Sequence, residues 1–277
     1  MATKRRGETV TTVISVTGAW DWLLRELDRW GESGRCADFW WRDDDAIDSS
    51  VQLDRLLQLS TRHNAPLALA VIPAQLKPAL SDKLHSYNQV SVLQHGYNHQ
   101  SHAARGERKL ELGGTRNHDD ILHDLSQGRQ ILQQQFGARF SPVLVPPWNR
   151  IDQTVVQALP ALGFAGISTM RVTRNAWPAA GLRQVNPHLD PINWRHGGGF
   201  IGLYPSIAIL IQHLKSRRSG YRDLAEPTGI LSHHLVQNDA VWRFLDDLFA
   251  LLAEHPGVNW IDAPSIWKTP ADIHQPD

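Results

Sequence analysis

The sequence predicts an α/β fold in which a single domain forms a closed or nearly closed β/α barrel. Short apolar runs that read as strands alternate with longer segments of helical periodicity, which is typical of parallel sheets with right-handed crossovers. The chain of 277 residues is 42% hydrophobic, enough to bury one large core, and has no internal repeat or clear linker. About seven strand–helix units favour a barrel. A doubly wound open sheet is the alternative.

Each predicted strand is a short apolar run, and most segments between these runs carry the apolar spacing of amphipathic helices. The predicted strands are residues 36–41, 66–72, 89–93, 142–146, 164–168, 228–232 and 258–261. The predicted helices are residues 49–63, 77–87, 119–136, 151–162, 205–217 and 238–254. The first helix has a serine cap, and its apolar stripe consists of Val51, Leu53, Leu56, Leu57 and Leu59. Residues 170–200, rich in Pro, Gly and Asn, give no clear element.

Two terminal segments flank the predicted barrel domain, residues 36–265. Residues 1–35 form an N-terminal extension in which "AWDWLLRELDRW" predicts a helix that packs on the barrel or on a partner, and residues 266–277 form a tail. The N-terminus is a poor signal peptide, and no stretch approaches the roughly 20 apolar residues of a membrane span. We therefore expect a cytoplasmic protein with no membrane partner.

The charge balance argues against a nucleic-acid partner. Lys+Arg and Asp+Glu are both 28, so the formal net charge is zero, whereas nucleic-acid binding usually requires a basic face. The single cysteine, Cys36, cannot form an intramolecular disulfide. Eleven tryptophans permit a carbohydrate cleft, because indoles stack on sugar rings, but core packing is the more common explanation for any single tryptophan.

Polar motifs directly follow four of the predicted strands. They are "RDDD" (42–45), "HGYNH" (95–99), "PPWNR" (146–150) and "SHH" (232–234). Barrel enzymes place their chemistry at the C-terminal ends of the strands. We therefore expect these motifs to face one common site.

His95 and His99 are candidate metal ligands. If His95 opens a helical turn, both imidazoles share one face and can bind the same ion. Such a pair alone is more often solvated or part of a core, but a nearby carboxylate changes this. Asp43, Asp44 and Asp45 supply carboxylates that repel one another unless a cation or donors compensate. A solvated loop or a helix cap is the alternative explanation for the aspartates.

Two histidines and one carboxylate leave a coordination position open, as in catalytic Zn²⁺ sites with ligand distances of about 2.0–2.2 Å. One aspartate can bind the ion while its neighbour accepts a proton, so the expected reaction is hydrolysis. His233 or His234 is a candidate general acid for a leaving amine, with Asp190 and Trp194 as candidates for orienting it. A histidine satisfied by backbone carbonyls is the alternative.

Five motifs together resemble the polysaccharide deacetylase family, the NodB homology or carbohydrate esterase family 4 type. They are "DDDA" (43–46), "HGYNH" (95–99), "PPWN" (146–149), "DPINW" (190–194) and "ILSHH" (230–234), in the family's order and approximate spacing. The resemblance implies a distorted (β/α)7 barrel that removes N-linked acetyl groups from sugars. It also implies an Asp-His-His divalent site, for which Zn²⁺ is the expected ion, with Co²⁺, Mn²⁺ or Ni²⁺ as alternatives.

The resemblance implies roles for individual residues. The metal ligands would be Asp45, His95 and His99. Asp44 would be the general base and His233 the general acid, with Asp190 tuning that acid. The backbone N–H of Trp148 would help to stabilise the oxyanion. The residues expected to contact the substrate are Trp148, Asn149, Trp194 and His234.

Three positions depart from the family pattern. Gly96 stands at a Ser/Thr place, and Ala46 replaces a glycine. Val145 stands where the family has an arginine that pairs with the base, so Arg42 or Arg150 would have to supply that charge. These departures bear on the substrate more than on the chemistry, because the ligands and the base are present.

The expected function is a metal-dependent hydrolase that removes an N-acetyl or related acyl group from an amino sugar or glycoside. Two alternatives stay open. One is a metal-dependent amidohydrolase acting on a non-sugar C–N bond, and the other is a non-catalytic carbohydrate-binding protein. The expected partner is a small carbohydrate or another N-acylated substrate.

Overall fold

Strand β1 (Ala37–Ala46) is hydrogen-bonded along both edges and organises the sheet. In this computed structural model, which describes residues 16–173 and 175–267, the strand order is β10-β1-β2-β3-β4-β5-β6, and β9 also pairs with β1. All pairs in this sheet are parallel. The other strands are β2 (Leu67–Val71), β3 (Val90–His95), β4 (Phe140–Val145), β5 (Gly166–Ile167), β6 (Arg183–Gln184), β9 (Thr228–Ser232) and β10 (Val258–Trp260).

The ring of strands is closed by residues 183–189, which continue beyond β6. The N–H of Val185 donates to the carbonyl of Ile167 in β5 at 3.2 Å. Farther along, the N–H of Leu231 in β9 donates to the carbonyl of Leu189 at 2.7 Å. One segment therefore joins β5 to β9, and β9 joins β1. The structure confirms the distorted (β/α)7 barrel, and the doubly wound open sheet is not formed.

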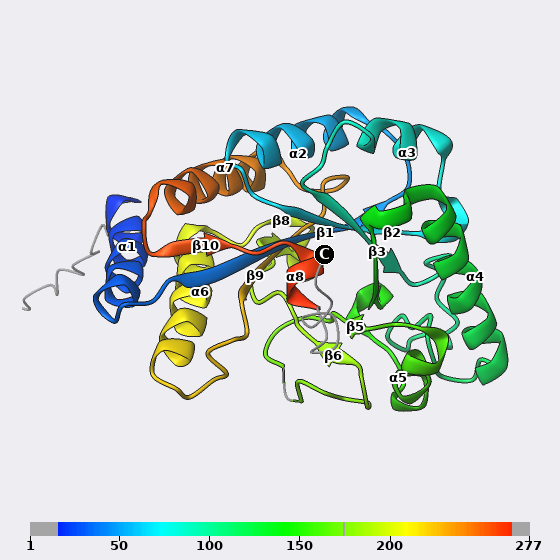
Figure 1. The fold of residues 1–277 in the computed structure, drawn as a ribbon. Helices are drawn as coiled ribbons and strands as arrows, with labels where there is room; N and C mark the ends of the chain where they lie inside the picture. The colour runs from blue at the N-terminus through cyan, green and yellow to red at the C-terminus, as the bar shows by residue number, and fades with distance from the viewer. Residues whose placement is uncertain (1–15, 174, 268–277) are drawn as a thin grey trace, which may run out of the picture.

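Helices surround the sheet, with α2, α3 and α7 on its upper side in Figure 1, α4 on the right and α6 on the left. Each predicted helix overlaps an observed one. The predicted helix at 151–162 is divided into α5 and a 3-10 turn, Leu159–Leu162, because Pro160 has no N–H to continue an α-helix. The helices around the barrel are α2 (Val51–Arg62), α3 (Pro78–Leu84), α4 (His118–Phe136), α5 (Gln153–Ala158), α6 (Leu203–Arg218) and α7 (Asp239–Glu254).

Strand β1 is longer than predicted, because the charged motif lies inside it. The prediction ended this strand at residue 41, but Arg42 and Asp43 continue the pairing with β9. Partners inside the protein compensate their charges. These two charged residues therefore belong to the buried strand and not to a loop. Regular pairing breaks only between Asp43 and Ala46, where Asp45 has a φ of 75°. That break lets consecutive aspartates point in directions that a regular pleat would not allow.

Residues 170–200, in which no element is predicted, contain β6 and a short antiparallel pair. This pair is β7 (Ile192–Asn193) with β8 (Gly199–Phe200), and the turn that follows β7 begins at Trp194. Each of these strands has two residues. Such strands are too short to give a period in the sequence, which explains why the prediction had no signal here.

The N-terminal end of the barrel is filled by the short helix α8 (Ala263–Ile266) and by Trp267. The Trp267 ring packs edge-on against Trp40 of β1 with centroids 5.4 Å apart, and its indole N–H donates to the carbonyl of Arg183 at 3.1 Å. The barrel interior thus includes Ile266 and Trp267, the first two residues of the predicted tail. Residues 268–277 lie outside the described part of the chain.

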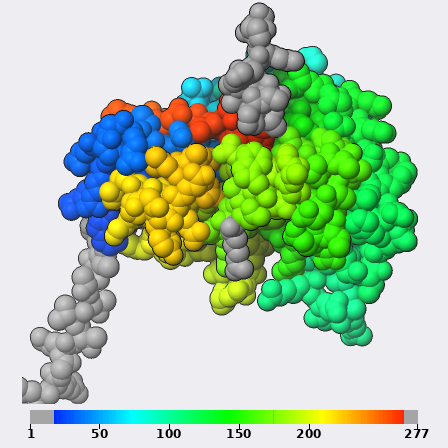
Figure 2. Space-filling view, turned by 60° about the horizontal axis from the view of Figure 1, so that its bottom comes forward, coloured from blue at the N-terminus to red at the C-terminus, as the bar shows by residue number. Residues whose placement is uncertain are grey.

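Helix α1 (Val16–Glu32) corresponds to the helix predicted in the N-terminal extension, and it packs on the outside of the barrel. The ring of Trp20 stacks on Phe244 of α7, and Trp22 contacts Tyr204 of α6. Figure 2 shows α1, in blue, lying beside α6, in yellow. Residues 1–15 lie outside the described part. Within residues 16–173 and 175–267, no helix combines the length and apolar character required to cross a bilayer.

Candidate active site and metal centre

The polar motifs meet at the C-terminal ends of the strands. Asp45 lies at the end of β1 and His95 at the end of β3, while the 3-10 turn Pro147–Asn149 follows β4 and His233 follows β9. These segments come from distant parts of the sequence, and parallel strand order brings their carboxyl ends to one edge of the barrel.

Asp45, His95 and His99 converge on one point. The Nε2 atoms of His95 and His99 lie 3.0 and 3.3 Å from Oδ1 of Asp45, and the ligand atoms all lie within 4.8 Å of one another. Ligands at about 2.1 Å from a tetrahedral Zn²⁺ ion are about 3.4 Å apart, so these spacings suit one small divalent ion. The two rings are 5.1 Å apart between centroids and inclined by 42°, which lets their lone pairs converge.

His95 is held with Nε2 facing the proposed ion position. Its Nδ1 lies 2.9 Å from the carbonyl of Val145 in β4, and this contact places the proton on Nδ1. A backbone partner of this kind is typical of metal-binding histidines, because it fixes both the tautomer and the ring orientation.

The pKa shifts of the three side chains reflect their proximity. Burial would raise the pKa of Asp45, but the hydrogen bond with His95 and the nearby imidazoles lower it well below its usual range. Burial would lower the pKa of His95, but Asp45 and the charge of Asp44 raise it. Burial and the charge of His95 lower the pKa of His99. These shifts follow from burial and from the short distances between the carboxylate and the two imidazoles.

The two histidines are brought together by a loop and not by a helical turn, so the expected helical geometry is wrong. His95 ends β3, and Gly96 and His99 have φ angles of 55° and 57° in the left-handed region. The next α-helix, α4, begins only at His118. The loop folds back on itself because its backbone N–H groups bind a side chain from a later segment.

That side chain is Glu111, which the sequence interpretation missed. Its Oε1 accepts hydrogen bonds from the backbone N–H groups of Tyr97, Asn98 and His99 at 3.1, 2.8 and 3.2 Å. Burial raises the pKa of Glu111, while these hydrogen bonds lower it in part. Glu111 lies in a polar segment without helical or strand periodicity, so no pattern marked it as part of the site. The only indirect sign was the glycine at position 96, where a larger residue was expected.

Arg42, not Arg150, supplies the positive charge beside Asp44. Nη2 of Arg42 donates to Oδ2 of Asp44 at 3.0 Å, and Nε lies 2.9 Å from Oδ1. Nη1 of Arg42 donates to both the carbonyl and the hydroxyl of Ser168, and Nη2 also donates to Oδ1 of Asn149. Arg150 instead donates to the carbonyl of Lys109. The side chain of Asn149 is therefore held by Arg42.

Asp43 and His234 form a separate buried pair on the other face of β1. The imidazole Nδ1 of His234 lies 2.5 Å from Oδ1 of Asp43, and Oδ2 of Asp43 accepts from the backbone N–H of His234 and from Ser232 Oγ. The side chain of His234 has no exposed surface. Because these bonds flank His233 on both sides in the chain, they fix the backbone that carries it.

His233 faces Asp44 across the site. Its Nε2 lies 4.0 Å from Oδ2 of Asp44, and the Trp194 ring packs edge-on against its imidazole with centroids 4.8 Å apart. Asp190 accepts hydrogen bonds from Trp194 Nε1 at 2.7 Å and from the N–H of Ile192 at 2.9 Å. Burial raises the pKa of Asp190, and His233 lowers it in part. Asp190 therefore interacts electrostatically with His233. It also binds Trp194, whose ring packs against His233.

Trp148 adopts a φ of 54° in the turn after β4. Its ring lies 4.6 Å from the ring of His99, and the ammonium of Lys109 lies 5.5 Å from its centroid. The side chain of Trp148 therefore covers one edge of the group formed by Asp45, His95 and His99, and with Trp194 it borders the site.

His188, His213 and Glu226 form a second group of potential ligands, between α6 and the start of β9. The two rings stack at 3.4 Å and 23°, so their ring-nitrogen lone pairs cannot both point at one ion. The N–H of Gly229 donates to His188 Nδ1 at 3.1 Å, which leaves the proton of the neutral ring on Nε2. This geometry suits a carboxylate beside two imidazoles rather than a metal ion.

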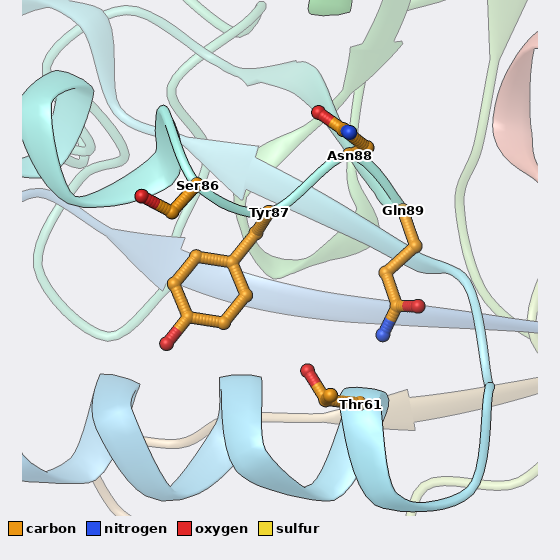
Figure 3. A pocket seen from close by; sticks show the side chains of 5 residues that line it. All are labelled: Thr61, Ser86, Tyr87, Asn88 and Gln89. Atoms are coloured by element: carbon orange, nitrogen blue, oxygen red, sulfur yellow. The ribbon is translucent and has the colours of Figure 1, made fainter.

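A surface hollow at the opposite end of the barrel is shown in Figure 3. It lies between the last turn of α2 and the residues that lead into β3, and it is lined by Thr61, Ser86, Tyr87, Asn88 and Gln89. Its side chains include no carboxylate or imidazole. The hollow offers hydrogen bonds but no group suited to the chemistry at the other end.

Comparison with known proteins supports the fold. No protein-family model and no curated protein matches the sequence. Among solved structures, a Mycobacterium smegmatis protein described as a polysaccharide deacetylase aligns with a TM-score of 0.62 at 15% identity, over 84% of this chain and 88% of that chain. A family 4 acetyl xylan esterase from Clostridium thermocellum, solved with a cobalt ion, aligns with a TM-score of 0.50 at 14% identity, over 83% and 89%.

A third similar structure is a family 4 pseudoenzyme from Bacillus anthracis. It aligns with a TM-score of 0.53 at 12% identity, over 84% of this chain and 66% of that chain. The chain therefore has the polysaccharide deacetylase fold, which both enzymes and a pseudoenzyme share.

Proposed function

We propose that this protein is a metal-dependent hydrolase that removes an acetyl or related acyl group from the nitrogen of an amino sugar. One observation carries the proposal. Asp45, His95 and His99 form one group of potential metal ligands, while the neighbouring Asp44 is paired with Arg42 and faces His233. The site thus provides separate groups for binding an ion, accepting a proton and donating one.

The donor set fits a divalent cation. Two imidazole nitrogens and one carboxylate oxygen are the ligands of many catalytic Zn²⁺ sites, and Co²⁺, Mn²⁺ or Ni²⁺ can use the same ligands. When bound, such an ion supplies a Lewis acid that polarises a carbonyl oxygen and lowers the pKa of water.

The proton transfers are assigned to Asp44 and His233. Asp44 accepts a proton from the attacking water, and Arg42 fixes the direction of its carboxylate. His233 Nε2 donates a proton to the leaving amine. At 4.0 Å these two groups are too far apart for a direct hydrogen bond, so each is available for a different proton. The backbone N–H of Trp148 is proposed to donate to the oxyanion.

The substrate contacts are assigned to two of the four residues expected from the sequence. Trp194 is 54% exposed beside His233, and Trp148 borders the ligand group, so both rings can pack against a sugar. We assign Asn149 and His234 to holding the site, because Arg42 binds the amide of Asn149 and Asp43 binds the buried His234.

The test is acetate release by Zn²⁺-loaded protein from a panel of N-acetylated sugars and non-sugar amides. We expect at least one N-acetyl sugar to be hydrolysed and Asp44→Asn to lower this release by about 10²- to 10⁴-fold. Turnover of other amides with no sugar turned over would replace the proposal with an amidohydrolase acting on a non-sugar C–N bond. The similar pseudoenzyme favours one further candidate, a non-catalytic carbohydrate-binding protein. Sugar binding without any hydrolysis would establish that candidate.

A further inference from the structure

Glu111 places a carboxylate under the loop that carries His99. Residue 111 is fully buried, and its Oε1 lies within 3.2 Å of three consecutive backbone nitrogens, those of Tyr97, Asn98 and His99. Consecutive N–H groups that point to one side form a concave site for an anion. Here the anion is a side chain of the protein itself.

Gly96 leaves the space that this carboxylate fills. A Cβ atom at position 96 would lie 2.1 Å from Oε2 of Glu111 and 2.6 Å from Cγ of Pro147. Gly96 also has a φ of 55°, which favours glycine. The glycine and the buried glutamate therefore depend on each other, although they are 15 residues apart in the sequence.

Burying a carboxylate has an energetic cost, and three backbone hydrogen bonds offset it here. What the carboxylate adds is a defined position for His99, whose N–H is one of the three donors and whose φ of 57° is unusual for a non-glycine residue. With its backbone fixed, the ring of His99 lies between Asp45 and Trp148.

We propose that Glu111 is a positioning residue for the metal centre, which holds the 96–99 loop so that His99 faces Asp45 and His95. This inference rests on the proposed metal-dependent function. Glu111 acts by accepting backbone hydrogen bonds and does not bind the ion.

The experiment compares three variants of the full chain. Glu111→Ala removes the acceptor, and Glu111→Gln keeps an oxygen that can accept the three hydrogen bonds but removes the charge. Glu107→Ala is the matched control, because Glu107 is an exposed glutamate of the same segment whose carboxylate accepts a hydrogen bond from the nearby N–H of Ala104. The first measurement is the affinity for Zn²⁺ and Co²⁺ by competition with a chelator. The second is hydrogen exchange of the amides of residues 97–99 without metal.

We expect Glu111→Ala to bind both ions about 10- to 100-fold more weakly, as is typical when a supporting partner of a metal ligand is lost. Glu111→Gln should stay within about threefold of the unaltered protein, and Glu107→Ala should not change the affinity. Exchange at residues 97–99 should accelerate in Glu111→Ala only. Unfolding curves for each variant show whether a loss of affinity follows from a loss of the fold.

Two results would overturn the inference while the proposed function stands. One is unchanged affinity and exchange in Glu111→Ala, and the other is a loss in Glu111→Gln equal to that in Glu111→Ala, which would assign the effect to charge. If the unaltered protein binds neither ion, the proposed function fails instead. In that case the positioning role of Glu111 for a metal centre is rejected as well. The exchange measurement then reports only whether Glu111 holds the loop.

Discussion

Arg42 and Asp44 form an ion pair inside the barrel from two positions of the same strand, with Nη2 donating to Oδ2 at 3.0 Å. Side chains two residues apart on a strand share one face, so β1 itself places the guanidinium beside the carboxylate. The side chains of both residues are almost completely buried. The charge that the resemblance expected from another strand is thus supplied from within β1.

The first prediction concerns this pair. Arg42→Met leaves Asp44 buried without its charged partner, so we expect the free energy of unfolding to fall by about 3–5 kcal/mol. Urea denaturation measures the change. Arg150→Met is the control and should change stability by no more than about 0.5 kcal/mol, because Arg150 donates to a carbonyl in a more exposed region. A loss below about 1 kcal/mol in Arg42→Met would show that Asp44 does not depend on this partner.

The second prediction separates the two aspartates that end β1. Asp45→Ala and His99→Ala should lose the metal, because each removes one of the converging ligand atoms. Asp44→Asn should keep the metal and lower turnover by about 10²- to 10⁴-fold, the range for removal of a general base. Metal analysis and acetate release on the same samples measure both effects. Full activity in Asp44→Asn would show that the base is assigned wrongly.

The third prediction tests the dependence of Gly96 on Glu111. Gly96→Ala places a Cβ atom against Oε2 of Glu111 and should weaken Zn²⁺ binding. In the Glu111→Ala background the same substitution should cost less affinity, because one of the clashing atoms is gone and the two effects are not additive.

Gly106→Ala is the matched control for backbone strain. Gly106 also has a positive φ, 88°, but a Cβ atom there would meet nothing within 4 Å. It should leave Zn²⁺ affinity unchanged. Equal losses of affinity for Gly96→Ala with and without Glu111 would contradict the proposed dependence.

The fourth prediction is a loss of stability in mild acid through His213. Burial, together with the charges of His188 and Arg217, outweighs Glu226 and lowers the pKa of His213 to about 4. Between the ordinary value of about 6.5 and this value, the unfolded chain binds a proton that the folded protein does not. The free energy of unfolding should therefore fall as the pH falls through this window, by up to about 1.4 kcal/mol per pH unit for one group.

Urea denaturation of chelator-treated protein at pH 7 and pH 5 measures this dependence, and chelation removes any contribution from metal binding. His213→Gln removes the titrating group and should reduce the difference between the two pH values. An identical difference in both proteins would show that other groups cause the acid sensitivity.

The elements with a strong local pattern could be predicted from the sequence. Strand β9 was predicted at 228–232 and is observed there, because a buried parallel strand is a continuous apolar run. Helix α7 begins at Asp239, one residue after the predicted start, since Asn238 caps it with its side chain. Residues 183–189 could not be predicted, because their pairing with β5 and β9 is set by the closure of the ring.

The candidate site was predictable where chemistry and strand ends coincide. Asp45, His95 and His99 stood out because three ligand-type residues followed two strands. Glu111 also has a carboxylate, but it accepts hydrogen bonds from backbone N–H groups 12 to 14 residues earlier in the chain. Such a contact leaves no pattern in the sequence. The choice between Arg42 and Arg150 depended on which face of β1 points into the barrel, which only the three-dimensional pairing decides.

The three consecutive aspartates of β1 have three different partners, which are set by their order along the strand. Asp43 faces His234 and Asp44 faces Arg42, while the break in the pleat turns Asp45 toward the histidines. Deleting one residue upstream within β1 would shift this frame and send each carboxylate to its neighbour's place. The length of β1 before position 46 therefore cannot change without moving Asp44, the proposed base, into the buried position that Asp43 now occupies.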